Sequence, residues 1–118
     1  MKQILITGAT GNVGVEVIRF LERSGSTDKI IAGVRNIERA KEQLKDFSNI
    51  NFVGFDFEQP ETFDNALKNT DTVFLLRPPH ISDTEKYFRP LVQKIKEHGV
   101  KEVVFLSVQG AEKSKVIP

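Results

Sequence analysis

Five short apolar runs alternate along the chain with segments in which apolar residues recur every three or four positions. Most of the runs are nearly continuous in Ile, Val, Leu and Phe, as in strands covered on both faces of a parallel sheet. They predict strands over residues 3–7, 30–34, 50–55, 72–76 and 102–106. The intervening segments have the spacing of amphipathic helices, which we expect over residues 12–24, 37–47, 60–67 and 82–98.

Residues that favour helix ends stand where these segments begin and stop. Asn36 is a suitable N-cap, and Pro60 suits a first helical turn. Ser82 and Glu85 have the spacing of a capping box, and Gly99 suits the end of the last helix. These residues support the predicted helix positions.

The strict alternation of strand and helix predicts a doubly wound α/β fold. Right-handed crossovers then make the sheet parallel, in the Rossmann-like order 3-2-1-4-5 with helices on both faces. Residues 109–118 show no clear pattern. Ligands of such sheets bind at the carboxyl ends of the strands, beside the switch point between the first and fourth strands.

The composition is that of an ordinary globular domain. The chain has 118 residues, of which 39% are hydrophobic and 28% charged, with a formal net charge of +1. This size allows one domain, and so small a net charge predicts no nucleic-acid or membrane partner. Cysteine is absent, which excludes disulfides and thiolate metal sites and suits the cytoplasm. No apolar run has membrane-spanning length, and we expect no signal peptide because the first strand starts so close to Met1.

The glycine-rich turn between the first strand and the first helix is the main candidate for binding chemistry. Gly8 would permit the tight turn, Gly11 would let a pyrophosphate approach the backbone, and Gly14 would let the helix pack close to the sheet. The N–H groups near Asn12 and Val13 would then face the phosphates at the positive end of the helix dipole. The alternative is a glycine-rich turn that binds nothing.

The end of the second strand carries arginine where NAD-preferring sites normally have an acidic residue. Arg35 stands at this position, and Arg39 follows one helical turn later. Two guanidinium groups favour a ribose 2′-phosphate, because they bind it through charge-assisted hydrogen bonds. The alternative is that Arg35 is a solvated side chain at a helix start.

The end of the third strand offers a carboxylate beside an aromatic ring. Asp56 could accept a hydrogen bond from an adenine amino group, with Phe57 against the ring. The alternative is that Asp56 is a turn residue before Pro60.

The last two strand ends would face the nicotinamide. Pro78 and Pro79 would form an extended wall there, and His80 is either a polar lining residue or simply exposed. Ser107 would lie near the reacting end of the cofactor, or else be a hydrogen-bonded residue at a strand end. His98, just before Gly99, is expected to be a helix C-terminal residue and not a catalyst.

Several of these segments together resemble the atypical short-chain dehydrogenase/reductases, and most closely the NmrA-like NAD(P)-binding proteins. The resemblance rests on Thr-Gly-Ala-Thr-Gly-Asn-Val-Gly, Val-Arg-Asn after the second strand, Asp-Phe after the third and Leu-Ser-Val-Gln-Gly after the fifth. It implies that NADP(H) is held by Gly8, Thr10, Gly11, Asn12, Val13, Arg35, Arg39, Asp56, Phe57, Leu76 and Arg77.

The chain departs from the catalytic pattern of the short-chain enzymes, in which tyrosine and lysine are spaced Tyr-x-x-x-Lys. Tyr87 is the only tyrosine, and Leu91 stands four residues later, so no catalytic residue is assigned. Two functions stay open: an NADP-dependent oxidoreductase that passes hydride to a small acceptor such as a quinone, and a regulator that senses NADP(H) and binds a protein partner. A sugar-nucleotide epimerase or dehydratase is less compatible with the arginine after the second strand.

The resemblance also implies a longer protein. Its members continue into more strands and a small C-terminal lobe that completes the substrate pocket. We therefore expect residues 1–118 to be the N-terminal NAD(P)-binding domain of such a protein, without its substrate-binding lobe.

Overall fold

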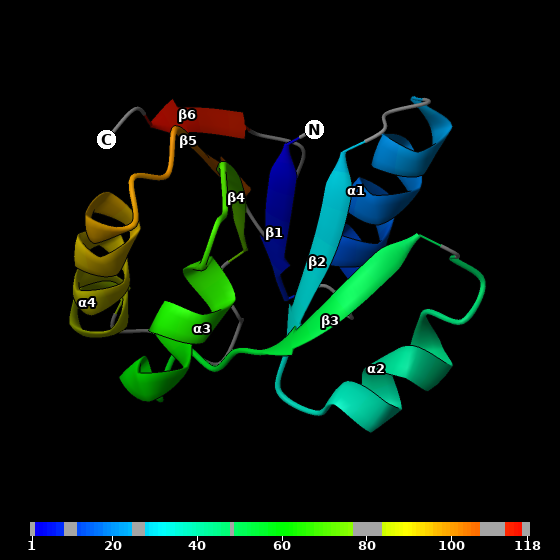
Figure 1. Ribbon diagram of the computed structural model, residues 1–118, viewed down its shortest axis with the longest axis horizontal. Helices are drawn as coiled ribbons and strands as arrows, with labels where there is room; N and C mark the ends of the chain where they lie inside the picture. Colours follow the sequence, from blue (N-terminus) through cyan, green and yellow to red (C-terminus); the bar gives the residue numbers. More distant parts are fainter. Residues whose placement is uncertain are drawn as a thin grey trace.

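The fold is a single six-stranded sheet with helices on both faces (Figure 1). The computed structural model describes residues 2–8, 12–24, 28–47, 49–76, 84–106 and 113–116. The strand order is β3-β2-β1-β4-β5-β6. The strands are β1 (Gln3–Thr7), β2 (Lys29–Val34), β3 (Ile50–Gly54), β4 (Thr72–Leu76), β5 (Glu102–Leu106) and β6 (Lys113–Val116).

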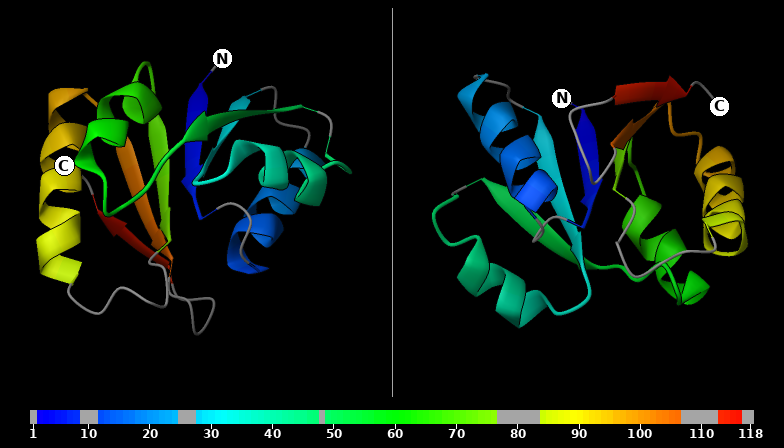
Figure 2. Two further views of the ribbon diagram at one scale, coloured as in Figure 1. Left: turned by 90° about the horizontal axis from the view of Figure 1, so that it is seen from below. Right: turned by 180° about the vertical axis from the view of Figure 1, so that it is seen from behind.

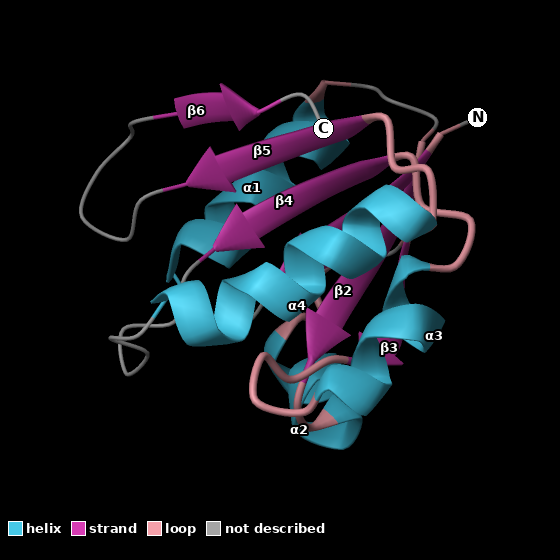
Figure 3. Cartoon of the chain, turned by 90° about the vertical axis from the view of Figure 1, so that its left-hand side faces the viewer, coloured by secondary structure: helices cyan, strands magenta, loops and turns pink. Residues whose placement is uncertain are grey.

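The helices lie in pairs on opposite faces of the sheet (Figures 2 and 3). One pair is α1 (Asn12–Arg23) and α2 (Ile37–Gln43); the other is α3 (Phe63–Leu67) and α4 (Thr84–Glu97). A short 3-10 turn, η1 (Pro60–Thr62), leads directly into α3. Each pair buries its own apolar cluster against the sheet, so the core consists of two layers.

The five-stranded parallel arrangement predicted from the sequence is confirmed. Strands β1 to β5 pair with one another only in parallel, in the predicted order 3-2-1-4-5. Asn36 caps α2 as expected, because its Oδ1 accepts a hydrogen bond of 3.0 Å from the Arg39 N–H. Gly99 has a φ of +69° just after α4, the left-handed conformation that a helix-ending glycine provides.

Two local features differ from the sequence prediction. β6 lies within the segment that showed no pattern and pairs antiparallel with β5. Its four residues, Lys-Ser-Lys-Val, are too few and too polar to give an apolar run, although lysine is common on edge strands. Helix α2 ends at Gln43 and not at residue 47, because Leu44 leaves the helical conformation at φ −110° and ψ 23° while its side chain stays buried.

Candidate functional site

The parallel register brings the ends of four strands to one edge of the sheet. Thr7 of β1 is paired with Gly33, and Val34 is paired with Gly54. The residues just beyond these pairs, Gly8, Arg35 and Asp56, therefore leave the sheet at the same edge, from which the chain also departs toward α2 (Figure 1). Leu76, the last residue of β4, lies at this edge too. The structure thus brings Gly8, Arg35, Asp56 and the backbone of Leu76 to one edge of the sheet.

The glycine-rich turn begins as the sequence predicted. Gly8 has a φ of +64°, a conformation that a residue with a side chain rarely adopts. Helix α1 starts at Asn12, so the backbone of Asn12 and Val13 forms its first turn, and Gly14 is buried on this helix. Thr10 and Gly11 lie outside the described residues. The phosphate-binding role of this turn stays a prediction.

Thr7 contributes a contact that sequence reasoning missed. Its side chain is 0% exposed, and its Oγ1 donates a hydrogen bond of 3.1 Å to the carbonyl oxygen of Phe74. This bond joins the carboxyl ends of β1 and β4, the two strands on either side of the switch point. The only sequence signal was the threonine itself at the start of the glycine motif; its partner stands 67 residues away.

Arg35 and Arg39 lie on either side of the cap of α2. Both residues are exposed, and Asn36 between them fixes the turn through its bond to the Arg39 N–H. Among the described residues, neither guanidinium forms an ion pair with a carboxylate. An anion approaching this edge would therefore meet two positive charges without having to break an existing pair.

Asp56 and Phe57 are placed by the turn after β3. Asp56 is half-buried, and its Oδ1 accepts a hydrogen bond of 2.9 Å from the Glu58 N–H, as in a carboxylate that stabilises a turn. Phe57 is 5% exposed and packs against Phe55 and Phe88, with ring centroids at 4.9 and 5.1 Å. The Phe57 ring therefore offers little surface to an adenine, whereas a contact between Asp56 and the adenine amino group stays a prediction.

The structure describes only part of the strand ends that are predicted to face a nicotinamide. The backbone of Leu76 is paired with that of Leu106 at the end of β4. Arg77 and Ser107 lie outside the described residues, as do Pro78, Pro79 and His80. Their predicted roles stay predictions.

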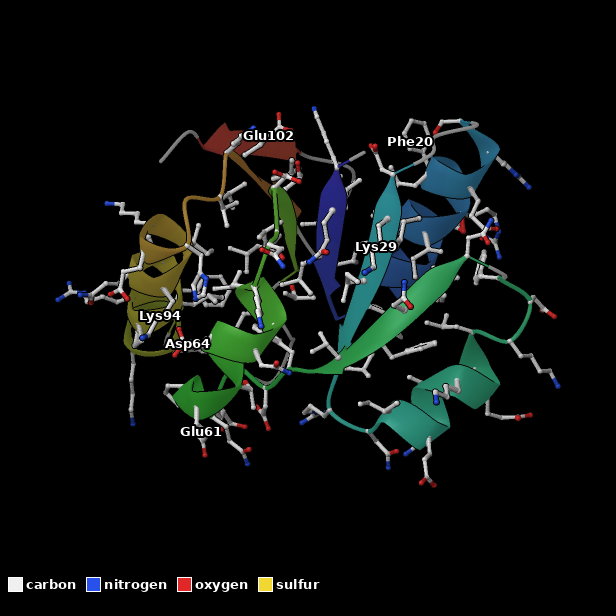
Figure 4. The ribbon with its side chains drawn as sticks, viewed as in Figure 1. Phe20, Lys29, Glu61, Asp64, Lys94 and Glu102 are labelled. Atoms are coloured by element: carbon white, nitrogen blue, oxygen red, sulfur yellow. The ribbon has the colours of Figure 1, made fainter. Side chains whose placement is uncertain are left out.

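A cluster of charged side chains joins α3 to α4 away from this edge (Figure 4). Asp64 Oδ1 lies 3.0 Å from His98 Nε2, and Asp64 Oδ2 lies 3.3 Å from Lys94 Nζ. Hydrogen bonds from His98 and from Lys94 lower the pKa of the Asp64 carboxyl, and Asp64 in turn raises the pKa of Lys94. Lys94 is in the last turn of α4 and His98 directly follows this helix, so the cluster lies near the amino ends of the strands, and we assign it a structural role.

This cluster predicts a small pH dependence of stability. A carboxyl group whose pKa is lower in the folded chain stabilises the fold above its ordinary value of 3.8, and this contribution is lost as the pH falls through the lowered value. The variant Asp64→Asn should therefore lose less stability than the unmodified chain between about pH 4 and pH 2. Urea unfolding at several pH values measures this, and Asp46→Asn, which removes an exposed carboxylate without an ion pair to the described residues, is the control.

The effect should be modest because the Asp64 side chain is 60% exposed, and exposed ion pairs contribute little. If the free energy of unfolding falls equally between about pH 4 and pH 2 in Asp64→Asn and in the unmodified chain, the cluster does not couple stability to pH.

Other ligand classes find little support in the described part of the chain. No group of three or more His, Cys, Asp or Glu side chains is placed there to hold a metal ion. No described helix is both long and apolar enough to cross a membrane. A hollow of about 590 Å³ opens between α2 and the edge strand β3, with Leu44, Phe47, Lys41 and Lys45 among its lining residues, but no residue of the predicted site lines it.

Comparison with known proteins identifies the family. Residues 8–117 match the NAD(P)H-binding family. The chain belongs to this family. The matched range starts at the glycine-rich turn and extends through β6, so family membership covers nearly the whole domain described above.

The proteins similar to this chain include enzymes and a protein named for differentiation. The chain is 38% identical over 114 residues to prestalk A differentiation protein A of Dictyostelium discoideum, covering 97% of this chain and 38% of that protein. Triphenylmethane reductase of Citrobacter sp., solved as a complex with NADP(H), is 29% identical with a TM-score of 0.76, over 86% of this chain and 36% of the reductase.

A quinone oxidoreductase shows the same relation. The NADPH-dependent quinone oxidoreductase of Escherichia coli, solved with NADPH, is 26% identical with a TM-score of 0.75. The match covers 86% of this chain and 35% of the oxidoreductase. The chain therefore spans little more than a third of the length of each of these proteins, in the part that forms the oxidoreductase-like NAD(P)H-binding fold.

Proposed function

We propose that the chain binds NADP(H) and forms the nucleotide-binding domain of an oxidoreductase that transfers hydride to a small acceptor such as a quinone. The observation that carries the choice of NADP(H) over NAD(H) is the position of Arg35, exposed just after β2 where an acidic residue would bind a ribose 2′-hydroxyl, with Arg39 exposed in the first turn of α2. The quinone oxidoreductase and the triphenylmethane reductase, both solved with NADP(H) or NADPH, support this choice.

The residues at the carboxyl edge fit the parts of such a cofactor. The backbone N–H groups at the start of α1 would bind the pyrophosphate, and the positive φ of Gly8 suits the tight turn that such a site needs between strand and helix. The two guanidinium groups would bind the 2′-phosphate, and Asp56 would accept a hydrogen bond from the adenine amino group. The bound nicotinamide supplies the hydride chemistry, while the chain binds and orients the cofactor.

We expect NADPH to bind about ten- to a hundredfold more tightly than NADH. Charge-assisted hydrogen bonds contribute roughly 1.5–3 kcal/mol each, and exposure and salt reduce that value here. The variant Arg35→Asp should erase or invert the preference, because a carboxylate repels a 2′-phosphate and accepts a bond from a 2′-hydroxyl. Arg39→Ala should weaken the preference by a smaller step. Calorimetric titration of both cofactors at low and moderate salt measures the ratio.

The control for this titration is Arg23→Asp, which makes the same change of charge at the far end of α1, beside the amino ends of the strands. This variant should keep the preference of the unmodified chain. Equal affinities for the two cofactors in the unmodified chain, or an unchanged ratio in Arg35→Asp, would show that Arg35 only faces solvent.

A second candidate function is a regulator that senses NADP(H) and binds a protein partner. Two observations favour it: the sequence has no Tyr-x-x-x-Lys pair, and one of the most similar relatives is named for differentiation. An assay of quinone-dependent NADPH oxidation by the full-length protein separates the candidates. Turnover supports the oxidoreductase, whereas tight binding of NADPH without turnover supports the regulator.

A further inference from the structure

The turn after β3 is closed by a small set of hydrogen bonds centred on Thr62. The Asp56 N–H donates to Thr62 Oγ1 at 3.1 Å, and this hydroxyl donates to the carbonyl oxygen of Gln59 at 2.8 Å. The Gln59 N–H donates back to the carbonyl oxygen of Asp56 at 3.0 Å. The Thr62 hydroxyl therefore links the two ends of the turn and holds the backbone of Asp56.

Buried phenylalanine rings anchor the same turn on both sides. Phe55 and Phe57 flank Asp56 in the sequence, and Phe63 follows Thr62; all three are 5% exposed or less. Phe55 contacts Phe57 at 4.9 Å and Phe63 at 5.5 Å between ring centroids. The backbone that carries Asp56 is thus held by core packing as well as by the Thr62 hydroxyl.

One oxygen of the Asp56 carboxylate accepts a hydrogen bond within the turn, and the other is available to a ligand. Oδ1 accepts from the Glu58 N–H, and among the described residues Oδ2 has no hydrogen-bond partner. A carboxylate only accepts hydrogen bonds, so the available oxygen matches a donor on a ligand. The 6-amino group of adenine is such a donor, whereas hypoxanthine has a carbonyl oxygen in the same place, which the carboxylate repels.

We propose that Thr62 is a positioning residue that holds Asp56 so that the site selects adenine dinucleotides over hypoxanthine dinucleotides. This inference rests on the proposed binding of NADP(H) and adds the selection of the base. It is independent of Arg35, because the two kinds of dinucleotide carry the same 2′-phosphate and differ only in the purine, where hypoxanthine has a carbonyl oxygen at position 6 and a hydrogen on N1.

The test compares the affinities of the 118-residue chain for NADPH and for reduced nicotinamide hypoxanthine dinucleotide phosphate, measured by calorimetry. One charge-assisted hydrogen bond predicts about tenfold tighter binding of NADPH. Asp56→Asn should bring the ratio to one or below, because the amide oxygen keeps the bond from the Glu58 N–H and the amide nitrogen then faces the ligand as a donor, which matches the carbonyl oxygen of hypoxanthine.

Three threonine variants test the role of Thr62. Thr62→Val removes the hydroxyl and should reduce the ratio to less than about threefold. Thr62→Ser restores the hydroxyl and should restore the ratio. Thr70→Val is the matched control: Thr70 is buried and its Oγ1 donates to the Ala66 carbonyl oxygen at 3.3 Å, but it precedes β4 at the opposite edge of the sheet.

The outcomes distinguish this inference from the proposed function. If the unmodified chain binds NADPH tightly but binds the hypoxanthine analogue equally well, the base-selection role is overturned and NADP(H) binding stands. The same holds if Thr62→Val leaves the ratio of the two affinities unchanged. An equal loss of selectivity in Thr70→Val would show that Thr62 acts only through general stability. If neither dinucleotide binds the unmodified chain, both proposals fail.

Discussion

Replacing Phe63 with alanine is expected to lower the free energy of unfolding by about 3–5 kcal/mol. The Phe63 side chain is 0% exposed and stacks against Phe55, so its removal leaves a cavity in the cluster that α3 and α4 bury against the sheet. Domains of this kind are stable by only about 5–15 kcal/mol. The loss is therefore a large share of the total free energy of unfolding.

Urea unfolding followed by circular dichroism measures this change. Phe20→Ala is the matched control, because it deletes the same ring from a side chain of α1 that is 66% exposed (Figure 4). We expect the control to change the free energy of unfolding by less than about 0.5 kcal/mol. A loss of under about 1 kcal/mol in Phe63→Ala would mean that the cluster closes around the missing ring.

The sequence predicted best those strands that consist of a nearly continuous apolar run, because such a run indicates a buried strand. Residues 72–76 and 102–106 became strands with the predicted limits, because parallel strands covered on both faces leave no place for polar residues. The end of α2 was harder to predict. Leu44 stays buried whether or not the helix continues, so its apolar character does not reveal where the helix ends.

The sequence predicted where the site residues lie, but not the contacts that their side chains form with distant residues. Gly8, Arg35 and Asp56 follow strands, so the topology alone predicted that they share an edge. The contacts of Thr7 and Thr62 could not be predicted in the same way. A threonine hydroxyl bonds whichever carbonyl oxygen or N–H the fold brings close, and for Thr7 that is Phe74, on another strand.

The packing of Phe57 has a similar cause. An aromatic residue after a strand can face a ligand or the core. It packs into the core where the neighbouring helices leave space that its ring can fill. Here α3 and α4 supply Phe63 and Phe88, and the ring of Phe57 completes that cluster. Asp56, its neighbour in the chain, is left at the edge for polar contacts.

The glycine-rich turn predicts the largest effect on binding. Gly11→Val should reduce the affinity for NADPH by more than about a hundredfold while the fold is retained. Gly11 immediately precedes the first residue of α1, and Gly8, three residues earlier, already turns the chain at a φ of +64°. A branched side chain at position 11 would occupy the space in which a pyrophosphate meets the free N–H groups of the first helical turn.

The magnitude follows from the bonds that would be lost. Displacing the pyrophosphate by the width of a side chain removes at least two charge-assisted hydrogen bonds, each of roughly 1.5–3 kcal/mol. Gly54→Val is the control, because a Cβ at position 54, near the same edge, would meet nothing within 4 Å. Calorimetry should show unchanged NADPH affinity in this control and none measurable in Gly11→Val, with matching circular dichroism spectra for both. Affinity of Gly11→Val equal to that of the unmodified chain would place the phosphates elsewhere, because no pyrophosphate can approach the start of α1 through a valine side chain.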